Sequence, residues 1–343
     1  MADKKLLYGV INAMTTPFTE KGAIDVESLR KQVAFQINAG VNCLYPLGTT
    51  GEMYLLSVKE RQLVAKTVVE EARRLDPKVV VYIHVGAMNT ADAIALAQHA
   101  EKIGADGIGA VTPSFFGASD RALLQYYKDI SQAVSRDFPI YLYSIPQCST
   151  NDISPALAAT IAKACPNVVG IKYSKADMPR ILEYINIRGG KFSVLVGPDR
   201  LFYAGLCSGA GGTVSGCAGP MPEPFVAIYK AWLAGRHDEC RKLQKKANEV
   251  IEIIKAGADM GVFKDVLVRR KVFVNLREKL EFMFEKPNIY LVLENDEHAA
   301  MTSPVLGRTI ILAGMRSASR RSLSACALLC PSMTISAASA RAA

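Results

Sequence analysis

The stretch Asn167-Val-Val-Gly-Ile-Lys-Tyr-Ser174 is a short apolar, β-branched run that Pro166 precedes. A run of this kind is typical of a strand that is buried on both faces. It carries Lys172 near its end, and a lysine is seldom buried without a reason. The residue is therefore predicted to be either a charge at the rim of a sheet or a reactive group.

Strand and helix patterns alternate eight times along the chain, and Gly or Pro marks most of the joints. This alternation favours an α/β fold of the (β/α)8 TIM barrel type over an open doubly wound sheet. Strands are predicted at residues 7–14, 43–47, 79–85, 107–111, 140–143, 167–172, 192–196 and 211–214. Helices are predicted at residues 25–38, 57–74, 90–103, 120–135, 154–164, 177–186 and 199–208, with further helices at 225–234 and 238–256.

Two helix starts carry clear capping signals. Asp25 precedes the first predicted helix, and Ser57 with Glu60 forms a capping-box pattern at the start of the second.

In a barrel of this type the carboxyl ends of the strands form the active face. Lys172 lies at such an end, where a partly desolvated amine is nucleophilic toward a carbonyl carbon.

The chain divides into three predicted parts: a barrel at 1–222, a helical extension at 223–275, and an atypical tail at 276–343. From residue 300 onward the sequence has five arginines and no acidic residue, and it is rich in Ser and Ala. This composition, without an amphipathic period, predicts a poorly ordered tail, and we assign it no function.

Composition excludes several classes of protein. The formal charge is +9 at pH 7, but no basic cluster interleaved with aromatic residues indicates nucleic-acid binding. The eight cysteines form no CxxC pair, the N-terminus does not resemble a secretory leader, and no apolar run reaches the length of a membrane span. We therefore expect reduced thiols in a cytoplasmic protein with no membrane partner.

The turn Gly48-Thr-Thr-Gly-Glu52 lies between a predicted strand and a predicted helix. Backbone N–H groups and the hydroxyls of Thr49 and Thr50 can bind a carboxylate or a phosphate there. A turn whose threonines satisfy the local backbone remains an equal alternative. The GxxxxGK spacing of a P-loop is absent.

Tyr141 and Tyr143 alternate onto one side of their strand, and Tyr143 is nearer the carboxyl end. A tyrosine there can relay protons, although a buried tyrosine with a satisfied hydroxyl is the commoner case. The segment Gly104-Ala-Asp-Gly107-Ile-Gly109 resembles a nucleotide-binding fingerprint only loosely, because its glycines do not follow a strand, and a packing role is the better interpretation. The four histidines are scattered singly, so no metal site is predicted.

Three motifs, Gly48-Thr-Thr-Gly-Glu52, Tyr143-Ser-Ile-Pro146 and Gly170-Ile-Lys172, follow the expected strands in the expected order. Together they resemble the dihydrodipicolinate synthase/N-acetylneuraminate lyase family of class I, Schiff-base pyruvate aldolases. The resemblance extends from about residue 7 to about residue 260.

The resemblance implies a role for each matching residue. Lys172 matches the lysine that forms an imine with pyruvate, and Tyr143 matches the tyrosine that moves protons. Thr49 and Thr50, next to Gly48, match the pair that binds the pyruvate carboxylate. The resemblance also implies a homotetramer arranged as a dimer of dimers, with no metal and no organic cofactor.

Departures from the family's motifs bear on the substrate. Ser144 replaces the motif asparagine, and Cys148 stands where dihydrodipicolinate synthases place an arginine for the carboxylate of the aldehyde. A thiol cannot form the bidentate ion pair that arginine offers. The tyrosine that follows the Thr112-Pro113 pair in family members is replaced by a Ser-Phe-Phe sequence at 114–116.

Other positions match the sialic acid lyases. Ser174 matches a hydroxy residue after the lysine, and Gly197 and Asp199 match a segment that binds sugar hydroxyls, although Arg200 replaces its glutamate. The favoured function is cleavage or condensation of a 2-oxo sugar acid, of the N-acetylneuraminate or 2-keto-3-deoxy type, with pyruvate and an aldehyde as small-molecule partners. The alternatives are 4-hydroxy-tetrahydrodipicolinate synthase, a hydratase or dehydratase that uses the same imine, and a non-catalytic barrel that binds 2-oxo acids.

Overall fold

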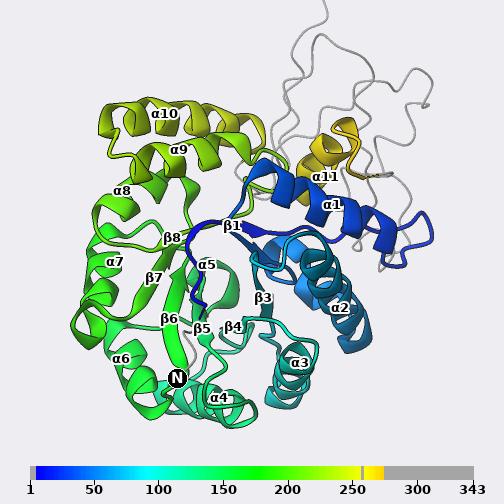
Figure 1. Cartoon of the computed structure of the whole chain (residues 1–343). Coiled ribbons are helices and arrows are strands. Elements are labelled where there is room, and N and C mark those ends of the chain that lie inside the picture. The colour runs from blue at the N-terminus through cyan, green and yellow to red at the C-terminus, as the bar shows by residue number, and fades with distance from the viewer. Residues whose placement is uncertain (1–4, 256–258, 274–343) are drawn as a thin grey trace, which may run out of the picture. The chain divides into compact units, whose positions relative to one another are not determined.

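Eight parallel strands close into a barrel in the order in which they occur along the chain (Figure 1). The computed structural model describes residues 5–255 and 259–273. The chain divides into two units, Met1–Tyr290 and Leu291–Ala343, and all described residues belong to the first. The predicted (β/α)8 barrel with helices after it is confirmed.

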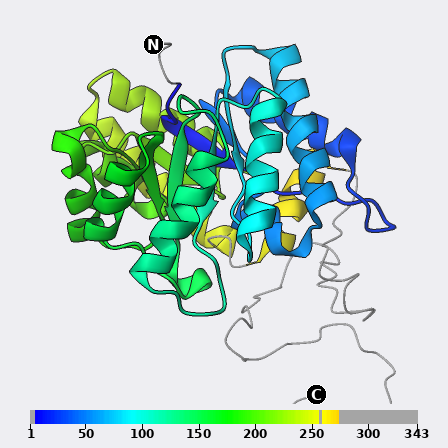
Figure 2. The ribbon, with the colours of Figure 1, turned by 90° about the horizontal axis from the view of Figure 1, so that it is seen from below.

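The strands and helices lie close to their predicted ranges. The strands are β1 (Gly9–Ala13), β2 (Cys43–Tyr45), β3 (Val80–His84), β4 (Gly107–Val111), β5 (Ile140–Ser144), β6 (Val168–Tyr173), β7 (Ser193–Val196) and β8 (Gly212–Ser215). The helices between them are α1 (Val26–Ala39), α2 (Val58–Leu75), α3 (Thr90–Lys102), α4 (Asp120–Gln132), α5 (Pro146–Ser149), α6 (Pro155–Ala164), α7 (Met178–Ile185) and α8 (Phe202–Cys207). Figure 2 shows the strands running between the flanking helices.

Among the described residues, three helices follow the barrel: α9 (Glu223–Leu233), α10 (His237–Ile253) and α11 (Met260–Arg269). The sequence patterns predicted α9 and α10 but neither α11 nor the short α5. The predicted limits of the barrel and of its helical extension, at residues 222 and 275, stay predictions. The predicted tail at 276–343 lies outside the described residues.

Local capping explains where the first helices begin. The Asp25 carboxylate accepts a hydrogen bond from the Ser28 N–H at 3.0 Å, which satisfies an amide that the helix itself leaves unpaired. Ser57 and Glu60 form the predicted capping box, because each side chain accepts a hydrogen bond from the other residue's backbone N–H.

Tyrosine rings fill the inside of the barrel, and glycines on nearby strands leave room for them. A Cβ atom at Gly109 would lie 1.8 Å from the Tyr45 Oη, and one at Gly170 would lie 2.6 Å from the Tyr141 Cε1. The predicted packing role of Gly109 is confirmed. Because the interior is packed, a small molecule can reach the barrel only at one of its ends.

Candidate active site

The amine of Lys172 lies inside the barrel, near the carboxyl end of β6. Lys172 is 6% exposed, and its Nζ lies 3.9 Å from the ring centroid of Tyr143 and 5.6 Å from that of Tyr45. The register of β5 and β6 pairs Tyr143 directly with Lys172. The two rings attract the ammonium form electrostatically and keep water away from the amine. Lys172 is thus a buried amine and not an exposed charge at the rim.

The hydroxyl of Tyr143 connects the surroundings of Lys172 to the threonine turn (residues 48–52). The Tyr143 Oη and the Thr49 Oγ1 are 3.2 Å apart, and either hydroxyl can be the donor. The two residues are 94 positions apart in the sequence, and closure of the barrel brings them together. The hydrogen-bonded hydroxyls of Tyr143 and Thr49 therefore link the surroundings of the Lys172 amine to the turn.

The threonine turn has an unusual backbone at both ends. Residues Thr49–Gly51 form one 3-10 turn, and the flanking Leu47 and Glu52 have φ angles of 68° and 57°. A left-handed conformation costs a residue with a side chain about 1–2 kcal/mol. Strain of this kind is concentrated at functional sites, where the surrounding structure maintains it. The leading N–H groups of such a turn have no partner within it, so they are available to an anion.

The other predicted binding residues follow β6 and β7. The N–H of Gly197 donates to the Tyr173 carbonyl at 2.8 Å, and a Cβ atom at Gly197 would lie 2.1 Å from the Ser174 Oγ. Glycine is therefore required for Ser174 to approach this closely. Asp199 comes two residues later, at the start of a 3-10 turn before α8. The structure brings the predicted residues from β6 and β7 to the same end of the barrel as the threonine turn.

The carboxyl group of Asp199 is electrostatically unusual. Its Oδ1 is enclosed and has no hydrogen-bond partner among the described residues. Burial raises the pKa of the Asp199 carboxyl, while nearby polar groups of Ser215 and Cys217 and the charge on Lys172 act in the opposite direction. The enclosed Oδ1 of Asp199 can therefore accept a hydrogen bond from a bound molecule.

Sequence patterns did not identify two further residues beside the amine, Tyr45 and His84. Their rings meet edge to face, with centroids 6.1 Å apart, and the His84 ring meets Tyr143 in the same way at 5.8 Å. His84 Nε2 accepts a hydrogen bond from the Val111 N–H at 3.1 Å, which leaves the proton of the neutral ring on Nδ1. Tyr45 ends β2 and His84 ends β3, and their place in two predicted strands was the available signal.

Protonation of His84 is expected to destabilise the fold in acid. Burial, then the charges of Arg61 and Lys172, hold the pKa of His84 well below its ordinary value of 6.5. The unfolded chain therefore binds a proton below pH 6.5 that the native state resists, so stability falls as the pH falls, by at most about 1.4 kcal/mol per pH unit.

Thermal unfolding of the wild type and of His84→Gln between pH 8 and pH 5 tests this expectation. The glutamine carbonyl can still accept a hydrogen bond from the Val111 N–H but does not titrate. The unfolding temperature of the variant should depend less on pH below 6.5. Parallel curves would assign the acid sensitivity to other groups.

The positions that depart from the family's motifs face in different directions. Ser144 follows Tyr143 on β5, and its hydroxyl donates to Asp152 at 2.8 Å, so this residue points away from the barrel interior. Cys148 lies exposed on α5. The guanidinium of Arg200 pairs with Glu252 of α10 at 2.6 Å, so this charge is already engaged. None of the three residues therefore offers an unpaired positive charge that could bind a carboxylate near the Lys172 amine.

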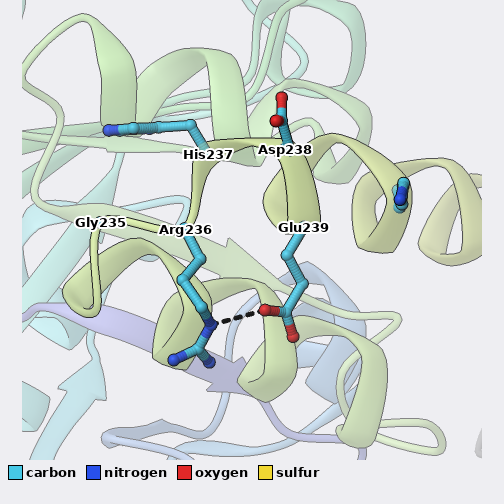
Figure 3. A pocket seen from close by; sticks show the side chains of 6 residues that line it. Gly235, Arg236, His237, Asp238 and Glu239 are labelled. Carbon is cyan, nitrogen blue, oxygen red and sulfur yellow. Dashed lines mark hydrogen bonds and ion pairs between the residues drawn. The ribbon is translucent and has the colours of Figure 1, made fainter.

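A hollow at the start of α10 is unrelated to this site. Figure 3 shows that charged side chains surround it, including an ion pair between Arg236 and Glu239 at 2.5 Å. Its lining residues are Gly235, Arg236, His237, Asp238, Glu239 and Lys242, and none of them is a predicted site residue.

The described residues hold neither a metal-binding cluster nor a membrane-spanning helix. No three His, Cys, Asp or Glu side chains in this part of the chain gather closely enough to hold a metal ion. In the same part, no helix combines the length and the apolar character needed to cross a membrane.

Comparison with known proteins gives one consistent family. The family model described as the dihydrodipicolinate synthetase family matches residues 6–278. A 4-hydroxy-tetrahydrodipicolinate synthase of Rhizobium meliloti is 37% identical over 241 residues, which cover 70% of this chain and 80% of the relative. An N-acetylneuraminate lyase of Mediterraneibacter gnavus is 34% identical over 244 residues, which cover 71% of this chain and 76% of the relative.

A solved structure agrees with these relatives. YagE, a prophage protein of Escherichia coli K12 belonging to the dihydrodipicolinic acid synthase family, was crystallised in complex with pyruvate. Its chain matches this one with a TM-score of 0.74 and 28% identity, over 80% of this chain and 92% of that chain.

Proposed function

Because the chain belongs to the dihydrodipicolinate synthetase family, whose members are carbon–carbon lyases, we propose that Lys172 forms a Schiff base with pyruvate. One observation carries the proposal. The buried Lys172 amine lies 3.9 Å from the Tyr143 ring centroid, and the hydroxyl of that ring is 3.2 Å from Thr49. These distances support the proposal, because one small 2-oxo acid could contact the proposed nucleophile, proton carrier and carboxylate-binding turn at the same time.

The chemistry begins with the neutral amine of Lys172. Its nitrogen attacks the C2 carbonyl carbon of the 2-oxo acid, and loss of water from the resulting carbinolamine leaves a C=N bond. The positive iminium nitrogen then accepts the electron pair that is released when a bond at C3 breaks. Cleavage of the C3–C4 bond gives an aldehyde and an enamine, and attack of the enamine on an aldehyde is the reverse reaction.

Tyr143 and the threonine turn are proposed to supply the proton and the orientation. The Tyr143 hydroxyl gives a proton to the departing water and takes one from the C4 hydroxyl during cleavage, and Thr49 relays protons through their shared hydrogen bond. The hydroxyls of Thr49 and Thr50 and the amides that begin at Gly48 bind the carboxylate. A fixed carboxylate holds the carbonyl carbon toward the amine, which lowers the entropic part of the barrier.

A 2-oxo sugar acid, of the N-acetylneuraminate or 2-keto-3-deoxy type, is the preferred substrate. Ser174 and Asp199 are proposed to bind its hydroxyl groups, with Gly197 allowing the close approach of the chain. The enclosed and unpaired Oδ1 of Asp199 supports this assignment, since a sugar hydroxyl can donate to it.

4-Hydroxy-tetrahydrodipicolinate synthase is the second candidate. The Rhizobium meliloti relative of that name is 37% identical, which favours it. The exposed thiol of Cys148 and the engaged guanidinium of Arg200 count against an aldehyde that carries its own carboxylate.

We also propose that four copies of the chain assemble as a dimer of dimers. Phe115 and Phe116 are 76% and 74% exposed and meet edge to face, and Phe115 has a φ angle of 76°. Exposed aromatic groups in a strained loop are typical of a surface that another protein covers. Sedimentation equilibrium should give the mass of four chains, and a monomer at micromolar concentration would contradict the proposal.

Borohydride reduction in the presence of pyruvate tests the Schiff base. The wild-type protein should gain one reduced pyruvyl group, and peptide mass spectrometry should find it on Lys172. A folded protein that gains no group would overturn the aldolase proposal and would favour a barrel that only binds 2-oxo acids. If the adduct forms, cleavage assays with 2-oxo sugar acids and condensation assays with carboxylate-bearing aldehydes distinguish the two candidate functions.

A further inference from the structure

A buried ion pair joins the threonine turn to the last described helix. The Nζ of Lys264 on α11 lies 2.6 Å from the Oε2 of Glu52, and the two side chains are 0% and 6% exposed. The ring of Phe18 covers the same ammonium group, with its centroid 4.5 Å from the Nζ. Few charges are so completely enclosed, and such pairs require close geometry to offset the loss of water.

Glu52 belongs both to this ion pair and to the turn, so the ion pair can stabilise the conformation of the turn. Its backbone N–H donates to the Thr49 carbonyl at 3.0 Å, so its main chain closes the 3-10 turn. Its φ angle of 57° is unfavourable for a residue with a side chain. An anchor on the side chain offsets that cost, and the ammonium group of Lys264 is such an anchor.

The neighbouring residue on α11 supports the other side of the turn. A Cβ atom at Gly216, just after β8, would lie 3.0 Å from the Thr50 Oγ1 and 3.2 Å from the Phe263 Cε2. The Thr50 hydroxyl and the Phe263 ring therefore both border the same glycine. Two consecutive residues of α11 thus lie beside the turn: Phe263 borders the glycine that also borders the Thr50 hydroxyl, and Lys264 contacts Glu52.

We propose that Lys264 is a positioning residue: through Glu52 it holds the turn at 49–52 in the conformation that binds the substrate carboxylate. The inference rests on the proposed function of that turn. A purely structural role would change the stability of the fold without a selective change in the affinity for pyruvate.

Lys264→Met tests the inference, because methionine keeps much of the volume and removes the charge. Asp265→Asn is the matched control, since it breaks the ion pair with Arg269 on the same helix, where both side chains are more exposed. In Lys264→Met, the amides of residues 48–52 should exchange with deuterium faster. The pyruvate concentration for half-maximal borohydride trapping should rise at least about tenfold, since small displacements of a binding group have large effects. The control should leave both quantities unchanged.

A double variant separates positioning from stability. Lys264→Met leaves the Glu52 carboxylate buried without its partner, which destabilises the fold. Adding Glu52→Gln removes that charge and should restore much of the unfolding temperature. If Lys264 positions the turn, the double variant still exchanges quickly at 48–52 and still needs about tenfold more pyruvate.

The outcomes are distinguishable. Normal pyruvate dependence in a folded double variant would overturn the inference, and so would unchanged exchange at 48–52 in both variants. If the wild type itself traps no pyruvate, the proposed function fails, while deuterium exchange still decides whether the ion pair holds the turn. If Lys264→Met does not fold, the double variant alone supports or overturns the inference.

Discussion

Replacing Lys172 by alanine is expected to abolish the reduced pyruvyl adduct and to lower kcat by at least about 10⁴-fold. Loss of a catalytic nucleophile removes the covalent route itself, and effects of this size are measured for other enzymes of covalent mechanism. The rings of Tyr45 and Tyr143, which lie beside the amine, carry no amine that could form the imine in its place. Intact-mass measurement after borohydride treatment and steady-state kinetics provide the two readings.

Lys175→Ala is the matched control for this variant. Lys175 lies three residues further on and is exposed, so its removal should leave both the adduct and kcat close to the wild-type values. Circular dichroism should show that Lys172→Ala is folded, because the substitution removes a buried amine without exposing a charge. An adduct that persists in folded Lys172→Ala would assign the Schiff base to another lysine.

Tyr143→Phe is expected to lower kcat by about 10²–10⁴-fold, which is the usual contribution of a positioned acid or base. The variant keeps the ring that lies against the Lys172 amine and removes only the hydroxyl 3.2 Å from Thr49. The affinity for pyruvate should therefore change little, and the loss should appear in kcat and in the rate of adduct formation.

Tyr141→Phe provides a close control on the same strand. The Tyr141 hydroxyl is also buried, and it donates to the Ser193 Oγ at 2.8 Å deeper in the barrel. Its removal should cost a similar amount of stability, about 1 kcal/mol, but should leave kcat unchanged. Equal losses of kcat in the two variants would contradict a specific proton-transfer role for Tyr143.

The sequence was sufficient to predict the barrel because the barrel depends on local patterns. Buried strands read as short β-branched runs, and caps such as Asp25 and Ser57 mark the helices. The position of Lys172 near the end of such a run also followed from the sequence. The surroundings of Lys172 could not be predicted in this way. The distance between Tyr143 and Thr49 depends on the closure of the barrel and not on the spacing within either motif.

The residues that the sequence patterns did not identify belong to their sites only through contacts between distant parts of the chain. His84 is a lone histidine in the sequence, and only its neighbours Tyr45 and Tyr143 make it part of the site. Lys264 lies between Phe263 and Leu267 on the buried face of α11. A lysine within such an apolar stripe was a readable signal that a buried partner exists, but the sequence does not identify that partner.

The ion pair between Glu52 and Lys264 has a consequence for biosynthesis. The two residues are 212 positions apart, so a ribosome must translate most of the described chain before the pair can form. A nascent chain that ends before α11 can contain all eight strands, yet the carboxylate of Glu52 lacks its partner. If Lys264 positions the turn as proposed, the growing polypeptide reaches its full affinity for 2-oxo acids only after α11 has left the ribosome and packed against the barrel.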